Sequence, residues 1–174
     1  MPNIFKKEHN AANLPQSDNL GAQGSGKKGL LICETCKAVY FEKRWHRNME
    51  ALNNKESRAA FEHDTPTKFT LCPACAMIKN GQYEGRVRIN NIPPDFMKDL
   101  EGLINGFCER AYERDSMHRL IALDKKDGEW TVTLTENQLA HKLGQKIKDV
   151  FNAAKVETHF APEPSGAAEV KVTF

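Results

Sequence analysis

Apolar residues follow different patterns along the chain and divide it into three regions. Residues 1–28 are polar and show little apolar periodicity, which predicts a flexible tail. Residues 29–92 carry short apolar runs typical of strands, and the segment 86–89 alternates polar and apolar residues. The segment 90–94 is rich in Asn and Pro and marks a domain boundary, so a third region is expected at residues 93–174. The expected organisation is therefore a tail followed by two domains.

The region 93–174 predicts the order helix–strand–strand–helix–strand–strand. Apolar residues at helical spacing predict a first helix that ends near Asp115. These residues are Phe96, Leu100, Leu103, Ile104, Phe107 and Ala111. Four strands are expected at Met117–Leu123, Trp130–Thr135, Val156–Phe160 and Val170–Phe174. The turn at 124–128 predicts a hairpin, so the predicted fold class is α+β with an antiparallel sheet in this domain.

A second helix is expected after Thr135. Thr135 and Gln138 have the spacing of a capping box. The apolar stripe of this helix consists of Leu139, Leu143, Ile147, Val150 and Phe151. In the first helix, Gly102 and Gly106 each weaken helix formation by about 1 kcal/mol relative to Ala, unless close packing compensates.

Composition narrows the class of protein. The chain has 174 residues, of which 40% are hydrophobic and 28% charged, as is usual for a soluble protein with an ordinary core. No apolar run approaches the about 20 residues that cross a bilayer. The start of the chain lacks the apolar segment of a secretory signal. We therefore expect a cytoplasmic protein without membrane attachment.

The charge is distributed unevenly although the net charge is only +2. Residues 1–90 carry 14 basic and 9 acidic residues, a net of +5, whereas residues 91–174 carry 11 and 14, a net of −3. This asymmetry is a mild indication of an anionic partner for the first half. Two domains with ordinary solvated surfaces would give the same numbers.

Four of the five cysteines form two C-x-x-C pairs, Cys33 with Cys36 and Cys72 with Cys75. In a chain expected inside the cell, this spacing points to a metal rather than to disulfides. Four thiolates complete a tetrahedral zinc site and leave no position for a catalytic water, so we expect one structural Zn²⁺ in the domain 29–92. A tetrahedral iron site and a redox-active thiol pair are the alternatives. The long separation of the pairs fits either a zinc ribbon with an insertion or a treble-clef-like module, in which the second pair opens a short helix.

Other candidate sites have weaker support. Residues 21–27 partly match a phosphate-binding loop, but Lys28 stands where Ser or Thr is required and the preceding segment is polar. His46 and His63 flank the cysteine pairs and are expected at the surface. Cys108 fits a small buried apolar residue. Neither a carboxylate pair nor a nucleophile with a base stands out, so an enzyme is not expected.

Basic and aromatic residues accompany both cysteine pairs. The candidate RNA contacts are Lys43, Arg44, Trp45, Arg47, Arg86 and Arg88. RNA recognition combines cations that meet phosphates with aromatic rings that stack on bases. Trp45 taken alone is explained better by packing in the small core around a metal.

The order of three motifs resembles the nonsense-mediated-decay-three family. The two cysteine pairs are followed by Tyr-x-Gly-x-Val-x-Ile at 83–89 and by Leu-Ala-x-Lys-Leu-Gly at 139–144. The similarity covers roughly residues 30–174, and the layout is most similar to short bacterial relatives of the family. Eukaryotic members are export adaptors of the large ribosomal subunit and, like archaeal members, carry more C-x-x-C pairs. The resemblance implies zinc at the four cysteines and association with ribosomes or ribosomal RNA, and it identifies no catalytic residue.

Two functional expectations follow. The first is a non-catalytic structural-zinc protein that binds the ribosome or another structured RNA. The second is a protein–protein adaptor, in which the acidic region 93–174 docks a protein partner and zinc only stabilises the first domain.

Overall fold

The computed structural model of the chain describes residues 30–41, 43–52, 67–126, 128–160 and 166–174. These residues form two mixed sheets, three α-helices and a short 3-10 helix, so the α+β class is confirmed. The predicted tail, residues 1–28, lies outside the described residues. None of the helices in the described parts of the chain is both long and apolar enough to cross a membrane.

The first sheet is small and has the strand order β3-β2-β1-β4. Its strands are β1 (Leu30–Cys33), β2 (Val39–Phe41), β3 (Arg44–His46) and β4 (Thr67–Thr70). A hairpin surrounds the first cysteine pair, because β1 pairs antiparallel with β2. β4 lies parallel to β1 at the edge of the sheet. Leu30, Val39 and Leu52 form a small buried cluster of this region.

Helix α2 (Pro73–Asn80) follows the first sheet and contains the second cysteine pair in its first turn. Cys72 caps the helix, because its Sγ accepts a hydrogen bond from the backbone N–H of Cys75. Pro73 suits the first helical position, where no intrahelical N–H is needed. The helix ends at Gly81, whose φ of 64° is the left-handed conformation that closes helices.

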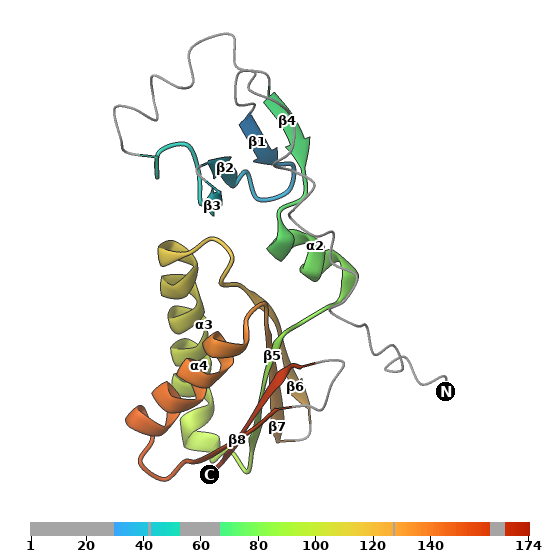
Figure 1. Ribbon diagram of the computed structural model, residues 1–174. Coiled ribbons are helices and arrows are strands. Elements are labelled where there is room, and N and C mark those ends of the chain that lie inside the picture. The colour runs from blue at the N-terminus through green and yellow to red at the C-terminus, as the bar shows by residue number, and fades with distance from the viewer. Residues whose placement is uncertain (1–29, 42, 53–66, 127, 161–165) are drawn as a thin grey trace.

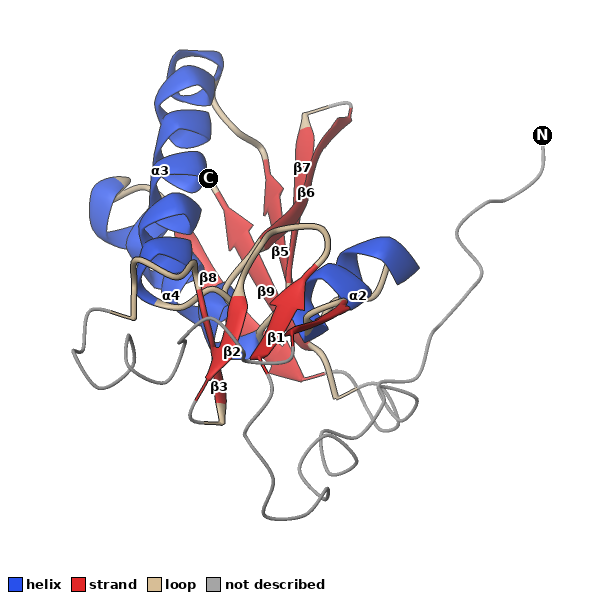
Figure 2. Cartoon of the chain, turned by 90° about the horizontal axis from the view of Figure 1, so that it is seen from above, coloured by secondary structure: helices blue, strands red, loops and turns tan. Residues whose placement is uncertain are grey.

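The second sheet has five strands in the order β6-β7-β5-β9-β8. Their bounds are β5 (Gly85–Asn90), β6 (Leu120–Lys126), β7 (Glu129–Leu134), β8 (Lys155–Phe160) and β9 (Ala168–Thr173). The short helix η3 (Pro94–Phe96) leads into α3 (Met97–Arg114), and α4 (Asn137–Val150) follows β7. Both long helices lie on the same face of the sheet (Figures 1 and 2). Their apolar stripes share one buried core with the strands.

The prediction of an antiparallel second sheet is wrong. β5 pairs antiparallel with β7 but parallel with β9, so the sheet is mixed. Its central strand, β5, comes from the region that we expected to belong to the first domain. The alternation at 86–89 correctly predicts a half-buried strand. This strand lies at the centre of the second sheet because its apolar side packs in the core beneath the helices. Val87 and Ile89 are fully buried, and Gly85 lies against Ala140 and the carbonyl of Glu136.

The start of α4 differs from the predicted capping box. Glu136, not Thr135, is the N-cap, because its carboxylate accepts hydrogen bonds from the N–H groups of Gln138 and Leu139. The Thr135 hydroxyl instead donates to the carbonyl of Met117 and accepts from the N–H of Arg119. It therefore joins the end of β7 to the segment before β6. On the apolar stripe, Leu139, Leu143, Ile147 and Phe151 are buried as predicted, whereas Val150 is half exposed.

Candidate metal centre

The two cysteine pairs meet although 35 residues separate them in the chain. The Sγ atoms of Cys33, Cys36, Cys72 and Cys75 all lie within 4.8 Å of one another. Those of Cys36 and Cys72 are 3.7 Å apart, close to the about 3.8 Å edge of a tetrahedron with a metal–sulfur distance of about 2.3 Å. The predicted convergence of these four residues is confirmed, and they can hold one metal ion.

Three different elements position the sulfur atoms. Cys33 ends β1, Cys36 lies in the turn between β1 and β2, and Cys72 and Cys75 belong to the start of α2. The turn is closed by the N–H of Cys33, which donates to the carbonyl of Ala38. β4 lies parallel to β1 and ends just before Cys72, so it delivers the second pair next to the first.

Backbone hydrogen bonds favour a thiolate at Cys33. Burial acts to raise the pKa of this thiol, but N–H donors from Cys36, Cys72 and Thr35 outweigh burial and lower the pKa to about 6. The N–H of Cys72 lies 3.4 Å from the Cys33 Sγ. Such donors also support metal-bound sulfur and tune the charge of the site.

The other pair shows why the four thiols would not all ionise without a cation nearby. Burial raises the pKa of Cys75 to about 11 and raises that of Cys72 further, and the Cys36 thiolate adds to both shifts. Without a metal, four neighbouring thiols therefore cannot all ionise. A divalent cation removes this repulsion, so metal binding releases protons and strengthens as the pH rises.

No other described ligand-type residue joins the cluster. The ring of His46 lies near the carbonyl of Phe41, with its Nε2 atom 3.3 Å from the oxygen. His63 lies outside the described residues. Cys108 is 4% exposed within the core of the second sheet, which confirms its expected role as a buried apolar residue.

The metal centre contacts the segment that follows α3. Trp45 and Met117 pack against the buried cysteine cluster, and Trp45 also lies 5.4 Å from the ring of Tyr40. The Ser116 hydroxyl, which is almost fully buried, donates a 2.9 Å hydrogen bond to the carbonyl of Trp45. The packing interpretation of Trp45 is therefore confirmed, and its ring is not a freely exposed stacking surface.

The predicted RNA-contacting cations lie in different surroundings. Lys43 and Arg44 are exposed at the turn between β2 and β3. Arg47 lies 4.0 Å from the carboxylate of Glu113 and above the ring of Tyr112. Arg47 therefore connects the segment after β3 to α3.

Arg86 and Arg88 share a carboxylate on the neighbouring strand β9. Glu169 lies 2.7 Å from the Nε of Arg88 and 3.9 Å from Arg86, whose guanidinium also stacks on the ring of Tyr83. Partial burial is the main reason why the pKa of Arg86 is lowered from its ordinary value. The two arginines point away from the helices, because they alternate with the buried Gly85, Val87 and Ile89.

The sequence interpretation missed the partners of these arginines. Glu169 and Lys171 face the same side as Arg86 and Arg88, since β9 runs beside β5 in the register Arg86 to Glu169 and Arg88 to Lys171. The alternation of polar and apolar residues in β9 was visible in the sequence. Its pairing with β5 was not, because the two strands are separated by two helices and three other strands.

Comparison with known proteins identifies no relative. No known protein family matches the chain, and no curated protein matches its sequence.

Proposed function

We propose that this chain is a non-catalytic zinc protein that binds the ribosome or another structured RNA. One Zn²⁺ at Cys33, Cys36, Cys72 and Cys75 would hold a treble-clef-like module together. The donor set supports this choice of metal, because four cysteine sulfur atoms gathered within 4.8 Å of one another are typical of structural zinc. The resemblance to the nonsense-mediated-decay-three family supports the ribosomal partner.

The observation that carries RNA binding is the cationic turn that joins β2 to β3. Lys43 and Arg44 are both exposed, and Lys43 adopts a φ of 65°, which non-glycine residues rarely occupy. Strained backbone of this kind tends to persist where the position of a side chain serves a function. The metal-supported sheet holds this turn in place, and such preorganisation lowers the cost of ordering cations on phosphates.

Co-sedimentation with ribosomes and a gel-shift assay with ribosomal RNA fragments test this proposal. The zinc-loaded chain should bind at low salt, and Lys43→Ala/Arg44→Ala should lower the affinity about tenfold. A control variant, Lys142→Ala/Lys146→Ala, removes the same charge from exposed positions of α4 and should bind normally. If the unaltered protein binds neither ribosomes nor RNA at low salt, the proposal is wrong.

A protein–protein adaptor is the second candidate function, and one observation favours it. Phe69 is 65% exposed on β4, which is an edge strand of the first sheet. Exposed large apolar residues on sheet edges are suited to pairing with another chain. A protein partner that stays bound after nuclease treatment, and that no longer binds the Phe69→Ser variant, would support this candidate over RNA binding.

A further inference from the structure

The second sheet has one face covered by α3 and α4 and one face that carries polar side chains. On the three central strands the polar residues alternate with fully buried ones, so they all point to the side opposite the helices. No helix of the described residues covers this surface, which is called here the uncovered face. It is formed by Arg86, Arg88, Asn90, Glu129, Thr131, Thr133, Glu169, Lys171 and Thr173. It offers cations, hydroxyls and amides in fixed rows.

Positive charge is concentrated on the central strands of the uncovered face. Arg88 and Lys171 lie directly opposite each other on neighbouring strands, an arrangement of like charges that costs stability. Arg86 lies two residues from Arg88 on the same side. Four carboxylates on this side offset part of this charge. Glu169 lies beside both arginines, Glu157 lies opposite Lys171 on β8, and Glu129 on β7 and Asp124 on β6 face the same side. Arg86, Arg88 and Lys171, named here the cation row, form the positive part of this face that suits an anionic partner.

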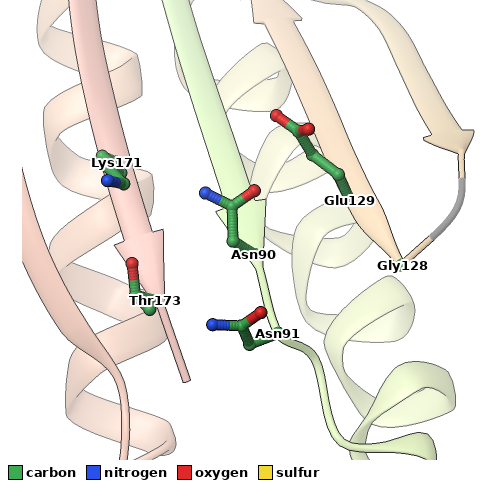
Figure 3. A pocket seen from close by; sticks show the side chains of 6 residues that line it. All are labelled: Asn90, Asn91, Gly128, Glu129, Lys171 and Thr173. Carbon is green, nitrogen blue, oxygen red and sulfur yellow. The ribbon is translucent and has the colours of Figure 1, made fainter.

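A pocket continues the cation row at the end of the sheet. It has a volume of about 420 Å³ and is lined by Asn90, Asn91, Gly128, Glu129, Lys171 and Thr173 (Figure 3). Asn90 ends β5 and Asn91 follows it, and Figure 3 shows both amides at this end of the strand.

The lining of the pocket favours a neutral group with hydrogen-bond donors and acceptors. Glu129 disfavours a phosphate there, whereas the two amides and the carboxylate match the edge of an unpaired base. Asn side chains pair with adenine and carboxylates accept from the amino group of cytosine in known protein–nucleic acid contacts. Bases are accessible in this way only where the nucleic acid is single-stranded.

We propose that the uncovered face binds a single-stranded segment of RNA. Phosphates lie along the cation row, and one unpaired base enters the pocket at Asn90 and Asn91. Glu169 competes with the phosphates for the two arginines and so limits the affinity. This inference rests on the proposed RNA-binding function and assigns it a second surface, separate from the turn at Lys43 and Arg44.

The probe is a fluorescein-labelled single-stranded RNA of mixed sequence and about 12 nucleotides, a length within the usual site size of strand-binding domains. Fluorescence anisotropy with the full zinc-loaded chain should show tighter binding of the single strand than of the same sequence in a duplex. Arg88→Ala/Lys171→Ala should weaken binding about tenfold or more. The slope of log affinity against log salt should fall by about 0.7 for each phosphate that the variant no longer binds.

Three further variants sharpen the test. Lys142→Ala/Lys146→Ala on α4 removes equal charge from the helical side and should leave the affinity within about twofold. Glu169→Gln removes the competing carboxylate and should raise the affinity severalfold. Asn91→Gly removes an amide while accepting the φ of 57° at this position. It should reduce the differences in affinity among oligo(A), oligo(C) and oligo(U).

The outcomes separate this inference from the proposed function. If ribosomes or RNA bind and only Lys43→Ala/Arg44→Ala weakens them, the inference about the uncovered face is wrong and the proposed function stands. Preference for the duplex, or lower affinity of Glu169→Gln, also overturns the inference. If no RNA binds at low salt, both fail. Circular dichroism melting of each variant checks that the change lies in binding and not in folding.

Discussion

At the scale of single residues, the cysteines show how surroundings decide chemistry. Cys72 and Cys108 are both almost completely buried, with 0% and 4% of their surface exposed. Cys72 lies among three other sulfur atoms, whereas Cys108 lies in an apolar core, where burial raises its pKa to about 11. Burial therefore does not separate a metal ligand from a structural cysteine, but the neighbouring sulfur atoms do.

Alanine substitutions of these two residues should have different consequences. Cys72→Ala should abolish stoichiometric zinc binding and unfold the first sheet, because a structural zinc contributes its binding free energy to folding. Cys108→Ala should keep one zinc per chain and cost about 1 kcal/mol of stability through a small cavity. Elemental analysis of the purified variants and urea unfolding measure both effects. Loss of zinc in Cys108→Ala, or its retention in Cys72→Ala, would contradict the assigned site.

The sequence predicted the convergence of the four cysteines for a physical reason. When two residues separate paired cysteines, both sulfur atoms of the pair can reach one ion. The closeness of the two sulfur atoms can therefore be predicted from the spacing alone. The ion pairs of Glu169 cannot be predicted from local spacing, since they join residues about 80 positions apart in the chain. For the same reason the sequence showed Arg86 and Arg88 as cations but not the carboxylate that they share.

At the scale of elements, two glycines in the helices have opposite roles. An added Cβ at Gly144 would lie 2.6 Å from the Cγ1 of Val170, because α4 packs closely on β9. At Gly102 in α3 an added Cβ would meet no atom within 4 Å. The concern that Gly102 weakens its helix without compensation therefore applies, whereas Gly144 is required by packing.

Substitution by alanine should separate these roles. Gly144→Ala should destabilise the protein by about 1–3 kcal/mol through overpacking. Gly102→Ala should stabilise it by about 0.5–1 kcal/mol, because Ala favours a helix interior. Urea unfolding followed by far-ultraviolet circular dichroism compares the two variants under one condition. Equal effects of both substitutions would show that the contact between α4 and β9 is looser than the structure indicates.

The existence of most elements was predictable, but their pairing and ends were less so. Local periodicity specified α3, α4 and the strands of the second sheet to within a few residues. It could not show that β9 enters beside β5, because strand order depends on contacts across the whole chain. The N-cap was misassigned because Thr is a preferred N-cap residue and Glu is not, although the Glu136 carboxylate caps α4. The competing contact of Thr135 with Met117 decided between them.

At the scale of the whole molecule, the metal centre and the second sheet have separate cores that meet at one seam. The apolar cluster around the cysteines and the core beneath α3 and α4 share no buried residue. Ser116, Met117 and the pair Arg47–Glu113 connect them. Such a seam is small compared with the second core, so we expect that core to fold without the metal.

The two tryptophans report on the two cores independently. Trp45 packs against the cysteine cluster, and Trp130 is 5% exposed in the second core. Removal of zinc by a chelator should shift the emission of Trp45 to longer wavelength, because its packing depends on the metal-linked turns. The emission of Trp130 should stay unchanged. Trp45→Phe and Trp130→Phe provide single-tryptophan proteins that separate the two signals, and re-addition of zinc should restore the emission of Trp45.

Lowering the pH should also change the emission of Trp45 without changing that of Trp130. Protons compete with the metal for thiolates, and the raised pKa values of Cys72 and Cys75 make this competition effective at mildly acidic pH. The zinc affinity should therefore fall as the pH decreases from 8 to about 6, and the Trp45 signal should follow it while Trp130 does not. If both tryptophans respond together to chelator and to acid, the seam couples the two cores into one cooperative unit. If neither responds, the four cysteines do not hold a metal that supports the fold.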